Sequence, residues 1–295
     1  MTLLDVTNAF STDDRCRELL ERLRWPNGPE CQRCKSTNVA RLSGRLLWCS
    51  ECSYQFTVTA GTIFHDSHLP LEKWFTAVYL MCESRKGISA NQVKRMLGIS
   101  YKTAWYLCHR IRSAMATVDR PMMDGKVEVD ETYIGGKRHG AGERGRGVSK
   151  EIVIGIRQRG GELRFFHAKD AKSKTLAKYI SENVSQDVEV MFTDDFGAYP
   201  NAMKRNAMGD RHKTIKHSSG QYVNGDIHTN TVESSFSLLK RGIIGTWHRI
   251  SAKHLAAYLE EMTFRFNRRN RNDLFLDTLR HMVTADPLTF ERLTA

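Results

Sequence analysis

The feature that most constrains the fold is a pair of C-x-x-C motifs near the N-terminus. Cys31 and Cys34 form the first motif, Cys49 and Cys52 form the second, and fourteen residues separate Cys34 from Cys49. This separation is just below the usual one for a four-cysteine zinc site. Zn²⁺ prefers four soft thiolates in a tetrahedron, and two tight turns supply them at little ordering cost. A redox dithiol is the alternative, but it needs only one such motif. The pair therefore predicts a structural zinc ion.

The sequence around these cysteines predicts a zinc ribbon over residues 31–60. Residues 39–48 are typical of a β-hairpin, and residues 54–59 alternate as a strand does. The order is therefore turn, hairpin, turn and strand. Residues 1–30 are predicted to form a short helical lead-in, because residues 13–24 are amphipathic.

Charge and length limit what the chain can do. Its 295 residues suggest two domains or slightly more. A net charge of +12 and a pI of about 9.5 favour a polyanionic partner, nucleic acid first and anionic membrane second, although a merely basic soluble protein would share them. Seven cysteines, an odd number, argue against a secreted disulfide scaffold. Without a membrane-spanning apolar run or a signal peptide, we expect a cytoplasmic, nucleoid-associated protein with no membrane partner.

Residues 68–118 are predicted to form a helix-turn-helix domain. Helices are expected over residues 71–83, 89–97 and 101–115, and Gly98 and Ser100 lie in the short turn between the last two. In a helix-turn-helix the last helix enters the DNA major groove by its N-terminal residues. The residues in that position are Tyr101, Lys102 and Thr103. A plain three-helix bundle is the alternative interpretation.

Two strand-like segments each carry adjacent acids. Asp130 and Glu131 lie within the first, residues 127–134, and aspartate is depleted in strands. A solvated edge would explain Asp130, and period-two alternation does not decide which of the two acids points into a site. The second strand, residues 188–195, ends in Asp194 and Asp195.

A third acid lies on a predicted helix, where Asn230 can cap the N-terminus and Gly242 can end it. Glu233 and Lys240 are seven residues apart and therefore share one helical face. The opposite face is an apolar stripe of Val232, Phe236 and Leu239. The alternative role for Glu233 is structural, since Asn230-x-x-Glu233 has the spacing of a capping box.

Together, these acids are the parts of a divalent-metal site. Carboxylates about 4 Å apart repel by roughly 4 kcal/mol at an effective dielectric constant of 20, so without a cation they would protonate or separate. Two Mg²⁺ or Mn²⁺ ions would reverse that balance and support in-line phosphoryl displacement. In a basic protein the natural substrate is a phosphodiester. Lys240, beside Glu233, would hold a phosphate near the metal ions.

A glycine-rich basic loop, residues 135–147, follows the first acidic strand. It does not match a phosphate-binding P-loop, which needs Gly-Lys-Ser/Thr at the start of a helix. We interpret it as an arm that touches the nucleic-acid backbone through Lys137 and Arg138. A merely solvated loop is the alternative.

These motifs resemble those of bacterial insertion-sequence transposases of the DDE type, which have an N-terminal zinc ribbon and an RNase H-like catalytic domain. The resemblance runs from about residue 31 to about residue 271. Its motifs are the four cysteines, residues 129–136, residues 193–199, and residues 228–233 followed by Lys240 and Arg241.

The resemblance implies a role for each acid. It makes Asp130, Asp194 and Glu233 the catalytic, metal-binding triad, and so favours Asp130 over Glu131 and Asp194 over Asp195. It also implies that Lys240, with Arg241 beside it, contacts transposon-end DNA.

The expected fold is α/β with a mixed sheet. We expect an RNase H-like DDE catalytic domain over residues 124–272, after the ribbon and the helix-turn-helix, and a C-terminal helical extension over residues 273–295. The expected function is that of a transposase that binds the terminal inverted repeats of its element and catalyses cleavage and strand transfer of DNA. It would act on transposon ends and target DNA as a dimer or higher homo-oligomer. The alternatives are a non-transposing nuclease of the same fold and a zinc-ribbon DNA-binding regulator with an inactive catalytic domain.

Overall fold

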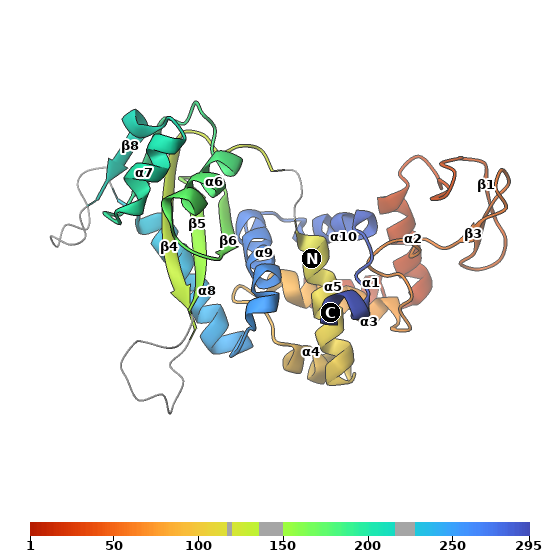
Figure 1. The fold of residues 1–295 in the computed structure, drawn as a ribbon. Coiled ribbons are helices and arrows are strands. Elements are labelled where there is room, and N and C mark those ends of the chain that lie inside the picture. The colour runs from red at the N-terminus through yellow and green to blue at the C-terminus, as the bar shows by residue number, and fades with distance from the viewer. Residues whose placement is uncertain (117–119, 136–149, 216–227) are drawn as a thin grey trace. The chain divides into compact units, whose positions relative to one another are not determined.

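The chain divides into two compact units. The computed structural model describes residues 1–116, 120–135, 150–215 and 228–295 (Figure 1). One unit contains Met1–Ala116 together with Arg268–Ala295, and the other contains Thr117–Asn267. The C-terminal residues thus pack with the N-terminal part of the chain, an arrangement for which the sequence carries no local signal.

The first unit begins with two helices and the ribbon. The helices are α1 (Leu3–Ala9) and α2 (Asp13–Arg24). The ribbon is an antiparallel sheet of β1 (Val39–Arg41), β2 (Leu47–Cys49) and β3 (Gln55–Phe56), in the order β1-β2-β3. The predicted hairpin is confirmed. The predicted strand over residues 54–59 is wrong in length, because only two of its residues pair with β2.

Three further helices follow the ribbon. They are α3 (Leu71–Glu83), α4 (Ala90–Leu97) and α5 (Tyr101–Met115), within a residue of the predicted bounds. The Ser100 hydroxyl accepts from the N–H of Thr103, and Gly98 ends α4 with φ +61°, a left-handed conformation that favours glycine. Near the C-terminus, α10 (Leu274–Thr284) packs against α2, α3 and α5, and α11 (Phe290–Thr294) ends the chain.

A five-stranded mixed sheet forms the centre of the second unit, in the order β6-β5-β4-β7-β8. Strands β4, β5 and β6 are antiparallel neighbours, whereas β7 runs parallel to β4 and β8 runs parallel to β7. Because β4 and β7 are parallel, their carboxyl ends meet at one edge of the sheet. The strands are β4 (Lys126–Ile134), β5 (Glu151–Gln158), β6 (Leu163–Ala168), β7 (Val190–Thr193) and β8 (His212–Thr214).

Helices cover both faces of this sheet (Figure 1). One core cluster joins the sheet to α6 (Ser173–Asn183) and α7 (Ala198–Arg205) and includes the odd-numbered Val127 and Val129 of β4. The other joins it to α8 (Asn230–Gly242) and α9 (Ala252–Arg268). The predicted α/β class with a mixed sheet is confirmed. Among the described residues, every helix is too short or too polar to cross a bilayer.

Helix α8 corrects one detail of the prediction, its N-cap. The helix already includes Asn230, its N-cap residue is Thr229, and the Thr229 side chain accepts no capping hydrogen bond from a backbone N–H of the first turn. The α-helix ends at Gly242 as predicted, but Gly242 keeps a helical conformation and leads directly into a π-helical turn, Ile243–Trp247. The predicted apolar stripe is confirmed, since Val232, Phe236 and Leu239 are all buried.

Candidate active site and zinc site

Three carboxylates meet at the edge of the sheet where β4 and β7 lie side by side. Glu128 pairs with Phe192 in the parallel register, so extending both strands by two residues brings Asp130 opposite Asp194. Ligand oxygens of Asp130, Glu131 and Asp194 lie within 4.8 Å of one another. Asp195 is exposed and lies outside this group. The cluster therefore contains two of the three predicted acids together with Glu131.

The two acids of β4 point to opposite faces of the sheet. Asp130 shares the strand face of Glu128, which contacts α8. Glu131 shares the opposite face, where the buried hydroxyl of Tyr199 on α7 donates to its carboxylate at 2.6 Å. The Glu131 N–H in turn donates to the Asp130 carboxylate at 2.8 Å. The Glu131–Tyr199 contact has no signal in the sequence, although the two residues lie in residues 129–136 and 193–199, the motifs that carry the family resemblance.

The cluster is electrostatically unfavourable without a cation. Burial, followed by the charges of Asp194, Glu131 and Glu233, raises the pKa of Asp130 to about 8. Burial also raises the pKa of Glu131, while the bond from Tyr199 opposes that shift. Carboxylate oxygens are the ligands that Mg²⁺ and Mn²⁺ prefer, so the donor set fits a hard divalent ion.

Glu233, the third predicted acid, lies on α8 outside the 4.8 Å group. Its charge nevertheless contributes to the raised pKa of Asp130. Its carboxylate accepts from the Thr229 hydroxyl at 2.6 Å. The capping box with Asn230 is not formed, because Asn230 lies inside the helix and is exposed.

A buried carboxylate that the sequence analysis overlooked fixes the start of α8. Glu128 is 0 % exposed, and its carboxylate accepts from the backbone N–H groups of Thr231 at 3.0 Å and Val232 at 2.9 Å. Arg159 at 2.7 Å and His228 at 3.3 Å also contact it. Glu128 therefore acts as the side-chain cap of α8, because it accepts from N–H groups of the first turn that have no partner within the helix. It also ties the helix that carries Glu233 to the strand that carries Asp130.

Gly155 allows α8 to lie directly on the sheet. It pairs with Asp130 across β4 and β5. A Cβ at this position would lie 2.7 Å from the Phe236 ring and 2.9 Å from Val232. Since such distances are too short for real contacts, only glycine permits this approach of the helix to Asp130.

The predicted DNA-contacting residues occupy two exposed surfaces. Lys240 and Arg241 are exposed at the end of α8. Tyr101, Lys102 and Thr103 are exposed at the start of α5, and the Lys102 ammonium lies 4.5 Å from the centroid of the Phe290 ring. Their contact with DNA stays a prediction, as does the helix-turn-helix interpretation of α4 and α5. Lys137 and Arg138 lie outside the described residues.

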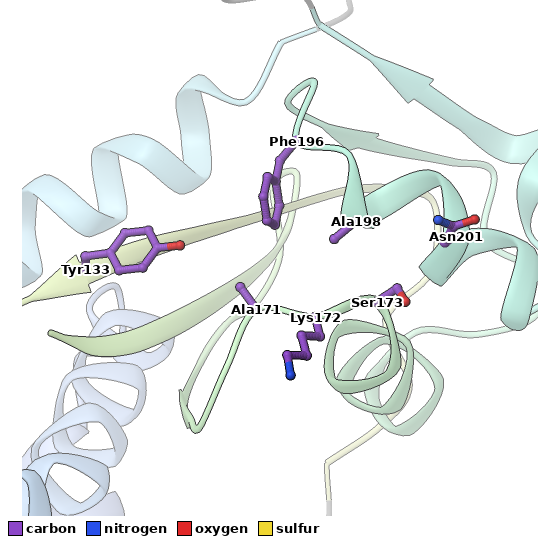
Figure 2. Close-up of a pocket in the computed structure, with 7 residues that line it drawn as sticks. All are labelled: Tyr133, Ala171, Lys172, Ser173, Phe196, Ala198 and Asn201. Carbon is purple, nitrogen blue, oxygen red and sulfur yellow. The ribbon is translucent and has the colours of Figure 1, made fainter. Parts of the chain in front are cut away.

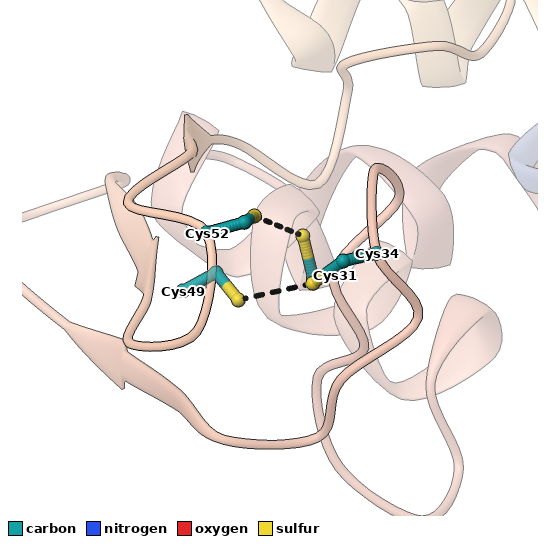
Figure 3. Close-up of side chains that lie close together, drawn as sticks. All are labelled: Cys31, Cys34, Cys49 and Cys52. Atoms are coloured by element: carbon teal, nitrogen blue, oxygen red, sulfur yellow. Dashed lines mark hydrogen bonds between the residues drawn. The ribbon is translucent and has the colours of Figure 1, made fainter.

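The four cysteines converge in the ribbon (Figure 3). The Cys31 and Cys52 sulfurs are 3.6 Å apart, and those of Cys34 and Cys49 are 3.5 Å apart. A tetrahedral ion with Zn–S bonds of about 2.3 Å separates its sulfurs by about 3.8 Å. Burial raises the pKa of Cys31, but the N–H groups of Cys34 and Arg33 lower it to about 7 overall. The N–H of Ser36 lowers the pKa of Cys34, but burial and the neighbouring thiols raise it to about 12, so the crowded thiols do not all ionise without a cation. The site therefore fits a structural Zn²⁺ held by thiolates.

The two cysteine turns have the same backbone geometry. In each, the residue after the second cysteine has positive φ, +64° at Lys35 and +56° at Ser53. Its N–H donates to the carbonyl of the first cysteine, at 2.8 Å for Cys31 and 2.9 Å for Cys49. This repeated turn brings both sulfurs of each pair to one side, which explains why the ribbon needs so few residues to build a metal site.

Comparison with known proteins identifies the class of protein. A family model described as an ISXO2-like transposase domain matches residues 122–267, and one described as a transposase zinc-ribbon domain matches residues 11–55. The chain is also 32 % identical over 276 residues to an uncharacterized protein in transposable element ISH50 of Halobacterium salinarum, covering 87 % of this chain and 91 % of that protein. The chain is a transposase. It belongs to the ISXO2-like transposase family with an N-terminal zinc ribbon.

Two solved structures of Mos1 are more distant. The strand transfer complex matches 71 % of this chain and 74 % of that chain at 7 % identity, with a TM-score of 0.31. The pre-cleavage transpososome matches 72 % and 78 % at 10 % identity, with a TM-score of 0.26. These similarities are too low to transfer any residue or partner.

Proposed function

We propose that the chain binds the terminal inverted repeats of its own insertion sequence and catalyses metal-dependent cleavage and strand transfer of DNA. The observation that carries this proposal is the carboxylate cluster at the β4–β7 edge, inside the region that matches the transposase domain. The raised pKa values of Asp130 and Glu131 and the oxygen-only donor set support a cation in this position. The strongly basic composition supports a polyanionic substrate.

Within this function, Asp130, Asp194 and Glu233 would hold two Mg²⁺ or Mn²⁺ ions, with Glu131 beside them. When bound, the ions would supply Lewis-acid chemistry that activates the attacking oxygen and stabilises the leaving oxygen of a phosphodiester. Hydrolysis breaks the P–O3′ bond and frees a 3′-hydroxyl. That hydroxyl then attacks a phosphorus atom of target DNA and displaces its 3′ oxygen. Glu128 keeps α8, and hence Glu233, in register with Asp130 during both steps.

DNA recognition is assigned to the surfaces outside the acid cluster. The exposed start of α5, with Tyr101, Lys102 and Thr103, reads the terminal repeat as the last helix of a helix-turn-helix does. Lys240 and Arg241, exposed at the end of α8, hold the DNA backbone. Since two ends must be joined to one target, the active species is a homo-oligomer, a dimer or larger.

A cleavage and joining assay tests this proposal. The substrate is labelled duplex from the DNA that flanks the gene, with Mg²⁺, Mn²⁺ or EDTA. Asp194→Asn and Glu233→Gln should retain binding but lose cleavage and joining by several orders of magnitude. Asp187→Asn is the matched control, because Asp187 is an exposed acid of the same unit outside the cluster.

Each outcome separates the proposed function from an alternative. Joined products with either metal, made by wild type and control alone, support the transposase. Nicking without joining would point to a non-transposing nuclease. Specific binding with no cleavage under either metal would point to a DNA-binding regulator, and Glu233 would then have a structural role through the bond that it accepts from Thr229.

A further inference from the structure

An open pocket of about 520 Å³ lies next to the acid cluster (Figure 2). It is bounded by Tyr133 near the end of β4, Phe196 after β7, Asn201 on α7 and Lys172 just before α6. In the view of Figure 2 the Phe196 ring and the Lys172 side chain lie on opposite walls. This volume is within the usual range for small-ligand sites. The roles assigned above leave the pocket unused.

Two residues that line the pocket adjoin the acid cluster. The backbone N–H of Phe196 donates to the Asp194 carboxylate at 3.1 Å, so the main chain that carries the ring is held beside a predicted metal ligand. Tyr133 follows Glu131 by two residues and lies on the same face of β4. After burial, the charges of Glu131 and Asp194 raise the pKa of the Tyr133 hydroxyl, as expected for a group close to both. A molecule in the pocket would therefore lie close to whatever occupies the cluster.

Two aromatic rings at this pocket are turned to solvent. Tyr133 is 47 % exposed and Phe196 is 39 % exposed, values that are high for large rings with apolar faces. The edge of Phe196 is held against Tyr199, with ring centroids 6.2 Å apart and an interplanar angle of 81°. This T-shaped contact orients Phe196 and leaves a ring face available for stacking.

The polar groups of the pocket suit a nucleotide. Lys172 supplies a cation for a phosphate, and Asn201 supplies an amide that can donate to and accept from the edge of a base. Among the described residues, none that lines the pocket is acidic, although the acid cluster lies beside it. An anionic group can therefore enter here with less repulsion than at the neighbouring carboxylates.

We propose that this pocket binds one unpaired nucleotide next to the scissile phosphate, its base stacked on Phe196 and Tyr133 and its phosphate against Lys172. The inference rests on the proposed function, because it needs DNA at the acid cluster. A paired base has both faces covered, so the nucleotide must leave its stack. Opening is easiest at a strand end or beside a nick. The aromatic faces then replace the lost stacking without selecting a sequence. Holding the neighbouring nucleotide would fix the reacting phosphate over the carboxylates.

A double-mutant cycle, which combines protein variants with DNA variants in a cleavage assay, tests the proposal. Wild type, Phe196→Ala and Phe196→Tyr are assayed for cleavage on the flanking duplex, intact or with a single abasic site at each position around the cut. Loss of stacking should reduce cleavage of intact DNA by Phe196→Ala about 5- to 150-fold. Phe196→Tyr, which keeps the ring, should cleave within a few-fold of wild type. At one abasic position Phe196→Ala should cause no further loss, because the base it would contact is already missing.

Photo-crosslinking provides a readout that does not need cleavage. Duplexes carrying 5-iododeoxyuridine at the same positions are irradiated with Asp194→Asn, and the crosslinked peptide is identified by mass spectrometry. Crosslinks should map to Phe196 or Tyr133 from a single nucleotide position. The proposed nucleotide binding would be wrong if crosslinks map only to other residues, or if the loss of cleavage in Phe196→Ala is equal at every abasic position. If wild type does not cleave but the crosslink forms, the proposed catalysis fails and the pocket stands.

Discussion

The ribbon and the acid cluster bring ligand atoms together in opposite ways. The four cysteines come from residues 31–52, and the two turns that carry them repeat one local geometry. The ribbon core around them is small, with four buried residues: Cys31, Leu47, Cys49 and Phe56. A core of this size contributes little stability by itself, so we expect a metal ion held by the four cysteines to supply most of it.

The acids are instead brought together by tertiary structure. Asp130 and Asp194 meet because β4 and β7 pair in parallel, and Glu128 and Gly155 fix α8 against the same strand. Two extensive clusters of buried side chains hold the sheet. From this contrast we expect the ribbon to depend on a bound ion for its folding, and the sheet to keep its acids crowded whether or not an ion is bound. Metal removal should therefore unfold the ribbon, whereas the acid cluster should stay in place with its carboxylates repelling one another.

Removing the ribbon's metal should have the largest effect of all. Cys31→Ser, or chelation of the wild type, should unfold residues 31–60, because structural zinc contributes about 10–16 kcal/mol in small metal-dependent folds. Hydrogen exchange should show loss of protection in β1 to β3 while β4 to β7 keep theirs. Cys16→Ser is the control, since Cys16 is a buried thiol in α2 outside the ribbon and should keep the full zinc content. A ribbon that stays protected without zinc would remove the contrast between the two sites.

Breaking the Glu128 network should have the next largest effect. Glu128→Gln leaves Arg159 without the opposing buried charge, and loss of one partner of a buried pair costs about 3–5 kcal/mol. The start of α8 should lose exchange protection and cleavage should fall, while the exposed Glu189→Gln changes neither. Denaturant unfolding measures the stability change. If activity falls while α8 stays protected, Glu128 acts by a route other than positioning the helix.

The sequence was sufficient wherever the information is local. The cysteine spacing predicted that the four sulfurs would lie together, and the alternation and helical periods predicted most strands and helices. Ser100 and Gly98 marked the turn between α4 and α5. Each of these features depends on residues within a few positions of one another. The adjacent acids of β4 and those that follow β7 also marked the site region in advance.

What the sequence did not predict depends on long-range contacts. Alternation placed Asp130 and Glu131 on opposite faces but could not say which face α8 would cover, and the structure brings both into the cluster. Glu128 had no local signal, since its partners on α8 lie about a hundred positions away. The capping-box spacing at Asn230 was misleading for the same reason, because a carboxylate from another strand binds the helix N-terminus instead. The association of α10 with the N-terminal helices is equally invisible in the sequence.

The pH dependence of stability tests whether the carboxylates of the acid cluster repel one another in the folded protein. The Asp130 carboxyl titrates near pH 4 when unfolded and near pH 8 in the metal-free fold, so the folded protein holds an extra proton between these values. Its contribution therefore lowers the stability of the metal-free unit as pH rises from 4 to 8. Asp130→Asn should raise stability at pH 8 by about 1–3 kcal/mol, after allowance for solvent screening, and should change little at pH 4.

Bound metal should oppose the stability advantage that Asp130→Asn has over the wild type at pH 8. Mg²⁺ or Mn²⁺ should stabilise the wild type by neutralising the cluster, and should stabilise Asp130→Asn less, because the variant has lost a charged ligand. Calorimetry of the full chain at pH 5 and pH 8, with and without metal, measures both effects, and Asp187→Asn is the control. A wild type that is most stable at pH 8 without metal would mean that the carboxylates are not crowded in solution.

The smallest expected effects concern DNA, and they compare a surface of each unit. Lys240→Ala removes one backbone contact, so it should weaken binding to all DNA sequences about equally and lower the salt slope by about one. Lys102→Ala, at the start of α5, should instead lower the preference for the terminal repeat over random DNA. Competition titrations at several salt concentrations measure both quantities. If Lys102→Ala also weakens binding to all DNA sequences equally, α5 binds DNA without sequence specificity, and another surface recognises the transposon ends.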